Sequence, residues 1–120
     1  MRQRSVRLTD AQWAAIEPHL PRHPRSRLGG RPRVPHRDVV DGILWVLKTG
    51  ARWRDLPAGY PSGSTCWRRL RAWDEDDTWL QMWRAFLGHL DARGRLQWEQ
   101  TFLDGSFASA KKGAPTSGKP

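Results

Sequence analysis

The stretch between Pro35 and Gly50 constrains the fold more than any other part of the chain. Its nine positions 39–47 hold six aliphatic residues and a tryptophan. Pro35 favours a helix start here, and Gly50 stands where a helix C-terminal stop is common. A helix so rich in apolar residues must be covered by other helices. The sequence therefore predicts a helix over His36–Thr49 at the centre of a mainly α fold.

Three further helices are predicted around this one. The first begins at Thr9, which forms a capping box with Gln12. The second begins at Ser62 or Ser64, both of which are favourable N-cap residues. The third covers Asp77–Leu90, where apolar residues recur at helical spacing. We expect these helices to pack around a core of Trp13, Ile43, Leu44, Leu47, Leu70, Trp73 and Trp83.

The charge of the chain points to a polyanionic partner. Twenty-one Lys and Arg residues outnumber twelve Asp and Glu residues, which gives a net charge of +9. A folded domain this basic repels itself, so nucleic acid is the first candidate partner, and a basic surface without a partner is the alternative. The single cysteine, Cys66, cannot form an internal disulfide. No apolar run approaches the roughly 18 residues of a membrane span. We therefore expect a cytoplasmic or nucleoid-associated protein, with no membrane partner.

The helix that begins at Ser62 or Ser64 has the pattern of a DNA-reading helix. Cys66, Leu70 and Trp73 share an inward apolar face, which leaves the arginines mainly outward. This arrangement suits a helix that enters the major groove, and a solvated basic face is the alternative. The connector before it, residues 51–61, is longer than the turn of a standard helix-turn-helix, so the likeness to that motif is loose. The candidate DNA contacts are Arg68, Arg69 and Arg71, together with Lys48, Arg52 and Arg54.

Acidic residues and the chain ends support fewer conclusions. Residues 75–77 are three consecutive acids, and we interpret them as favourable charges at a helix start rather than as metal ligands. Residues 1–7 form a basic arm. Residues 21–35 form a loop rich in proline and arginine, which either follows phosphates or is a plain basic linker.

The pattern changes after residue 95. Leu96–Leu103 alternates imperfectly between apolar and polar residues, which predicts a β-strand that ends at Asp104-Gly105. From Phe107 onward the composition is small and basic, and we expect no regular structure there. A single strand is not stable alone, so the predicted strand requires partners.

Three segments together resemble bacterial insertion-sequence transposases of the DDE, or RNase H-like, type. They are LTDAQWAAIEPHLP, GGRPRVPHRDVVDGILWVLKTGARWRDLP and FLDGSFASAKKG, in this order. In such transposases a small helical domain binds the terminal inverted repeats of the element, and a strand that ends in Asp-Gly begins the catalytic fold. The resemblance therefore implies that Asp104 is the first of three catalytic carboxylates and a ligand for Mg²⁺ or Mn²⁺ in the complete enzyme. Two-metal chemistry requires all three carboxylates.

The resemblance also implies a division of the chain. Residues 1–7 would be the arm, residues 8–95 a helical, helix-turn-helix-like DNA-binding domain of about four helices, and residues 96–120 the first strand of an incomplete RNase H-like domain with a tail. We expect the chain alone to be inactive and to need no cofactor, as an upstream frameshift product or a truncated copy would be. Its expected partner is the double-stranded DNA of the element ends, and a homodimer is possible. The alternative is a stand-alone DNA-binding transcriptional regulator or repressor.

Overall fold

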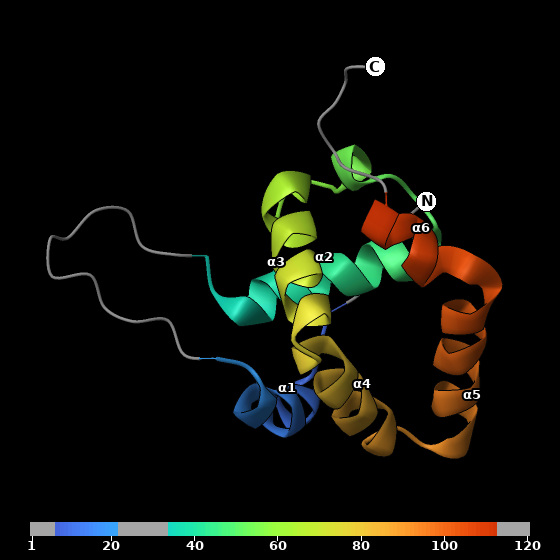
Figure 1. Cartoon of the computed structure of the whole chain (residues 1–120). Coiled ribbons are helices and arrows are strands. Elements are labelled where there is room, and N and C mark those ends of the chain that lie inside the picture. The colour runs from blue at the N-terminus through green and yellow to red at the C-terminus, as the bar shows by residue number, and fades with distance from the viewer. Residues whose placement is uncertain (1–6, 22–33, 113–120) are drawn as a thin grey trace, which may run out of the picture.

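The computed structural model describes residues 7–21 and 34–112, except for the side chains of Asp104 and Ser106. These residues form a helical assembly (Figure 1). The α-helices are α1 (Asp10–Ile16), α2 (His36–Thr49), α3 (Gly63–Glu75), α4 (Thr78–Gly88), α5 (Ala92–Thr101) and α6 (Phe107–Lys112). Two short 3-10 turns, η1 (Glu17–His19) and η2 (Trp53–Asp55), and a π-helical segment, η3 (Phe102–Ser106), connect them. The prediction of a mainly α fold is confirmed.

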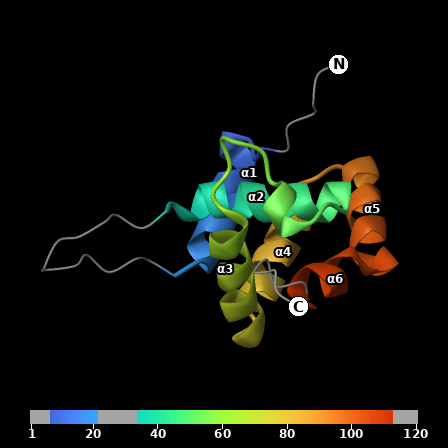
Figure 2. The same cartoon turned by 90° about the horizontal axis from the view of Figure 1, so that it is seen from above.

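Helix α2 is the centre of the molecule, as its sequence requires. Every residue from 39 to 47 is buried. Helix α3 crosses α2 near its middle, and α5 stands at the C-terminal end of α2 (Figures 1 and 2). A Cβ atom at Gly42 would lie 2.8 Å from the Sγ atom of Cys66, so a glycine is needed for α2 and α3 to approach this closely.

Helix α1 begins as predicted, and side chains of α2 hold the main chain just before it. The amide of Gln12 donates to Oγ1 of Thr9 at 3.1 Å, and the amide of Thr9 donates to Oε1 of Gln12 at 2.9 Å. The amide of Leu8 donates to Oδ1 of Asp41 at 2.8 Å, and Nη2 of Arg37 donates to the carbonyl of Leu8 at 2.8 Å. Two side chains of α2 therefore hold both polar groups of one residue just before α1.

The core is rich in aromatic side chains. Trp79 stacks on Trp83 and on Phe107, each with ring centroids 5.8 Å apart. Of the predicted core residues, Trp13 is half-buried and the other six are buried. The prediction of the core is therefore confirmed for the helices of the first 90 residues. No helix of the described segments has the length and apolar content needed to cross a membrane.

The β-strand predicted over Leu96–Leu103 is wrong, because this segment is helical. Asp91 caps α5 by accepting a hydrogen bond from the amide of Gly94 at 2.8 Å. Trp98 and Phe102 are four residues apart, a spacing that fits one face of a helix as well as one face of a strand. Both pack on Trp83, with ring centroids 5.9 and 5.5 Å from it. The sequence pattern therefore fits both a helix and a strand. In the helix that forms, Trp98 and Phe102 make these aromatic contacts.

The expectation of an irregular segment from Phe107 onward is also wrong for residues 107–112, which form α6. Gly105, with φ of 97°, turns the chain between α5 and α6. The residues after 112 lie outside the described part. Within residues 7–21 and 34–112 the structure contains no β-strand, so the beginning of an RNase H-like fold is not seen there. Helix α5 also continues across the expected domain boundary between residues 95 and 96.

Candidate nucleic-acid interface

Helix α3 has one buried face and one exposed face. The hydroxyl of Ser62 begins the helix by accepting a hydrogen bond from the amide of Thr65 at 3.2 Å. Cys66 and Leu70 are fully buried and Trp73 is nearly so, as the apolar spacing predicted. Burial raises the pKa of the Cys66 thiol to about 12. This side chain is therefore a packing residue at neutral pH, not a nucleophile.

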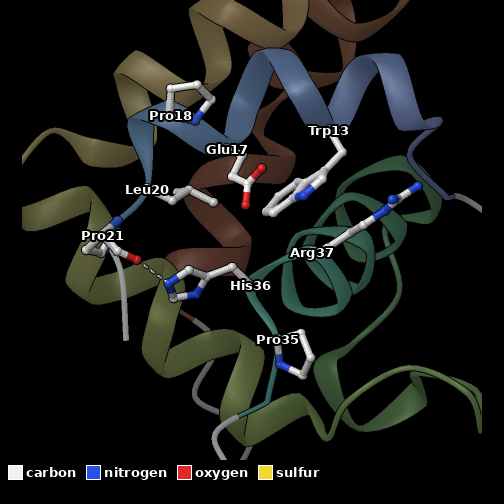
Figure 3. Close-up of a pocket in the computed structure, with 8 residues that line it drawn as sticks. All are labelled: Trp13, Glu17, Pro18, Leu20, Pro21, Pro35, His36 and Arg37. Atoms are coloured by element: carbon white, nitrogen blue, oxygen red, sulfur yellow. Dashed lines mark hydrogen bonds between the residues drawn. The ribbon is translucent and has the colours of Figure 1, made fainter. Parts of the chain in front are cut away.

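Arg69 does not lie on the exposed face, contrary to the prediction that the three arginines point mainly outward. Its side chain is half-buried, and its Nη1 donates to the carbonyl of Val34 at 2.6 Å and to Nδ1 of His36 at 3.1 Å. Nε2 of His36 in turn donates to the carbonyl of Pro21 at 2.6 Å (Figure 3). A neutral imidazole with its proton on Nε2 satisfies both contacts. We call the contacts of Arg69 and His36 with Pro21 and Val34 the polar clasp.

The polar clasp explains why one prediction was wrong. Arg69 joins α3 to Val34, just before α2, across 35 positions of sequence. His36, at the start of α2, joins Pro21, two residues after η1, across 15 positions. The ring of His36 also meets the edge of Trp73, with centroids 5.2 Å apart. Sequence reasoning placed Arg69 only by its position on a helix. The one available signal was the placement of His36 directly after a proline-rich loop.

Arg68 and Arg71 are both exposed, but their surroundings differ. The guanidinium of Arg71 lies 5.2 Å from the ring centroid of Trp67, and its Nη2 is 3.9 Å from Oε2 of Glu75. Arg68 makes no hydrogen bond or ion pair with any residue in the described part of the chain. Arg68 is therefore the arginine of α3 whose donors are available to a ligand.

The turn η2 brings two predicted arginines next to the first turn of α3. A Cβ atom at Gly63 would lie 2.5 Å from the carbonyl oxygen of Trp53, so η2 and α3 are in direct contact. Arg52 and Arg54 on either side of the buried Trp53 are exposed. Nε of Arg52 is 3.4 Å from Oδ2 of Asp55, an exposed pair that a phosphate can readily replace. The structure thus brings the η2 arginines together with the start of α3.

Lys48, the remaining predicted contact, lies elsewhere. Its Nζ is 5.1 Å from the ring centroid of Trp98, which places it against α5 at the C-terminal end of α2. Lys48 therefore lies beside α5, whereas Arg52 and Arg54 flank the residue of η2 that contacts the start of α3.

The acidic run that follows α3 serves the start of α4. Oδ1 of Asp76 accepts a hydrogen bond from the amide of Thr78 at 3.1 Å. Hydrogen bonds from the side chain and the amide of Thr78 lower the pKa of Asp76 below its usual range. The interpretation of these acids as helix-start residues agrees with this geometry. The carboxylate of Asp74 instead pairs with Nζ of Lys111 in α6 at 3.0 Å.

The described residues do not assemble a metal site. No three His, Cys, Asp or Glu side chains among them lie close enough together to hold an ion. Asp104 lies in η3, and its side chain is outside the described part. A single carboxylate cannot supply the ligands of a two-metal centre. Its role as the first catalytic carboxylate stays a prediction.

A surface pocket of about 790 Å³ was not foreseen from the sequence (Figure 3). It lies between the α1–η1 segment and the start of α2, beside the polar clasp. Its walls are formed by Trp13, Glu17, Pro18, Leu20, Pro21, Pro35, His36 and Arg37.

Comparisons with known proteins agree with the sequence resemblance. The model of a family described as "Putative transposase of IS4/5 family" matches residues 8–83, which run from before α1 into α4. The chain is similar to the "Insertion element IS402 uncharacterized 16.2 kDa protein" of Burkholderia cepacia, with 43% identity over 107 residues, 86% of this chain and 73% of that protein. It is also similar to "Uncharacterized protein y4sN" of Sinorhizobium fredii, with 35% identity over 68 residues, 57% of this chain and 53% of that protein. No solved structure matches. The family match covers more than half of the chain, and the chain therefore belongs to the IS4/5 family of insertion-sequence transposases.

Proposed function

We propose that this chain binds the double-stranded DNA of insertion-element ends through α3 and η2. The observation that carries the proposal is the exposed face of α3, which presents Arg68 while the opposite face is buried against α2. Two further exposed arginines, Arg52 and Arg54, flank the residue of η2 that contacts the first residue of α3. Membership of a transposase family supports DNA as the partner. The terminal inverted repeats are the part of an element that such a protein must recognise.

The physical properties of this surface suit duplex DNA. An α-helix fits the major groove, and an arginine fork matches both phosphate oxygens and the edge of guanine. The net charge of +9 attracts phosphates and releases the cations condensed on DNA, which makes binding favourable and dependent on salt.

We further propose that the 120-residue chain binds DNA without cutting it. Asp104 is the one acid that corresponds by position to the three carboxylates implied by the resemblance. Mg²⁺ or Mn²⁺ would act in a site that contains all three. DNA strand cleavage by the purified chain with Mg²⁺, abolished by Asp104→Asn, would contradict this part of the proposal.

Nuclease footprinting on the two ends of the host element tests the proposed function. We expect protection at the inverted repeats at both ends, with an apparent affinity that falls steeply as salt rises. The control duplex has the same base composition in shuffled order. Equal protection of the shuffled duplex would remove the element ends as the target, and no protection of either duplex would contradict DNA binding itself.

A further inference from the structure

The charges along α3 change sign from its first half to its end. Arg68 is exposed in the first half of α3. The turn η2 contacts the first residue of α3 and carries the exposed Arg54, with the exposed Arg52 directly before it. The last turn and the residue after it carry Asp74, Glu75 and Asp76, and Asp77 follows. Phosphates are attracted to the first half of the helix and repelled by its end. A duplex that approaches α3 should therefore meet the first half at close range.

The three arginines of α3 are held in three different ways. The guanidinium of Arg69 is used by the polar clasp. That of Arg71 leans over Trp67 and faces Glu75. That of Arg68 has no hydrogen bond or ion pair with any described residue. Base recognition by arginine needs two parallel donors, and of these three residues Arg68 is the one that can offer them without breaking an existing contact.

The residues that share a row of α3 with Arg68 are small enough to lie against the floor of the major groove. Ser64 precedes it by four residues and Ala72 follows it by four, so the three share one row along the helix. Ser64 is half-exposed and Ala72 is exposed. A short hydroxyl and a methyl group permit close approach to base edges, and a methyl group makes favourable contact with thymine.

From these observations we infer that α3 enters the major groove by its first half, where Arg68 binds O6 and N7 of a guanine while Arg52 and Arg54 bind phosphates. The acidic end of α3 stays outside the groove. This inference rests on the proposed function and adds to it which arginine reads sequence. It assigns Arg69 a positioning role, since the polar clasp fixes α3 against the start of α2.

The experiment selects duplexes from a randomised library with the full chain and then measures dissociation constants on the selected duplex and on single-base variants. We expect the wild type to discriminate one G·C pair by about tenfold. Arg68→Lys keeps the charge but loses the fork, so it should keep the salt dependence and lose that discrimination. Arg54→Ala should weaken binding equally on all duplexes and reduce the salt slope by about 1.

The matched control is Arg84→Ala, which removes an exposed arginine of α4 that has no hydrogen bond or ion pair within the described residues. It should change neither the base preference nor the salt slope. Unaltered base preference in Arg68→Lys, alongside normal binding by the wild type, would overturn the assignment of Arg68 and leave the proposed function intact. Absence of salt-dependent duplex binding by the wild type would overturn both.

The orientation of α3 has a separate test. An iron-chelate cleavage reagent can be attached to Ser64→Cys or to Glu75→Cys, because the native Cys66 is buried and its thiol is not reactive at neutral pH. We expect strong cleavage of the bound duplex from position 64 and at least fivefold weaker cleavage from position 75, an order-of-magnitude expectation for a helix that enters by its first half. Stronger cleavage from position 75 would overturn the orientation.

Discussion

Helices α1–α4 and the C-terminal segment α5–α6 are both helical, but they are held in different ways. Nine consecutive positions of α2 are buried by its neighbours, whereas α5 has no buried residue. Leu96 and Leu103 in the C-terminal segment are 56% and 80% exposed. That segment is held mainly by aromatic contacts and a few polar ones. The indole groups of Trp53 and Trp67 donate to the carbonyls of Ala110 and Lys111 at 2.9 and 3.0 Å.

This difference teaches that a helix can form without a core of its own. Helices α1–α4 bury one another, so loss of one side chain is felt by several elements. The C-terminal segment packs against the surface formed by α1–α4, and its buried residues are Phe107 and Ala110. We expect it to open locally before the α1–α4 body unfolds, because local stability follows buried apolar contact.

The largest expected effect is the difference between a leucine-to-alanine change in the α1–α4 body and the same change in the C-terminal segment. Leu70→Ala removes a fully buried side chain of α3 and should lower the free energy of unfolding by about 2–5 kcal/mol. Leu103→Ala, at an exposed position, should change it by less than about 0.5 kcal/mol. Urea denaturation followed by circular dichroism measures both. Equal losses at the two positions would break the comparison.

Reaction rates with a thiol reagent compare how accessible side chains are in the two regions. The raised pKa of Cys66 leaves a thiolate fraction at neutral pH roughly a thousandfold below that of an exposed thiol. We expect Cys66 to react with a thiol reagent only as the α1–α4 body opens. In Leu96→Cys the introduced thiol on α5 should react at the rate of a small-molecule thiol. Rapid modification of Cys66 in the native chain would show that α2 and α3 separate easily.

The hydrogen bonds that the two indole groups donate test whether α6 opens separately from the α1–α4 body. Trp53→Phe keeps most of the buried ring and removes the donor to Ala110, so we expect a loss of about 1 kcal/mol. Hydrogen exchange should then speed up in α6 and stay unchanged in α2. Faster exchange in α2 as well would show that α6 and the α1–α4 body open together.

The smallest effect concerns Asp41, whose side chain faces Arg7, Arg37 and Asp38. Burial raises its pKa above 3.8, while the hydrogen bond from Leu8 and the two arginines partly oppose this. The native state therefore binds this proton more tightly than the unfolded state, so the contribution of Asp41 to stability falls as pH rises from about 3.8 through the raised pKa.

Asp41→Asn tests this sign, because an amide oxygen can still accept the hydrogen bond from Leu8. The stability of the wild type relative to Asp41→Asn should decline as pH rises from about 3.8 through the raised pKa of Asp41. Thermal unfolding across pH measures this difference. A wild-type advantage that grows with pH would mean that Arg7, at 3.6 Å, outweighs the burial.

The parts of the fold that the sequence predicted are those coded locally. The capping box at Thr9 and the stop at Gly50 need only neighbouring residues, and both are seen in the structure. The prediction for the segment after residue 95 was wrong because the spacing of Trp98 and Phe102 fits both a helix and a strand. The cap at Asp91 would have favoured the helix.

The candidate site was predictable to a similar extent. The exposed positions of Arg68, Arg71, Arg52 and Arg54 follow from helix periodicity and from the basic connector. The polar clasp does not, because Arg69 meets Val34 and His36 only once α2 and α3 have packed. A residue that looks equivalent to its neighbour in sequence thus differs from it through a long-range contact.

The contacts that dock α1 have a consequence for how sequences of this family can diverge. Asp41 and Arg37 hold the amide and the carbonyl of Leu8, groups that nearly every amino acid carries. The identity of residue 8 is then limited only by the apolar space that its side chain fills. Evolutionary change should be tolerated more readily at position 8 than at positions 37 and 41. Two of the contacts that position the start of the first helix therefore depend on side chains of the second.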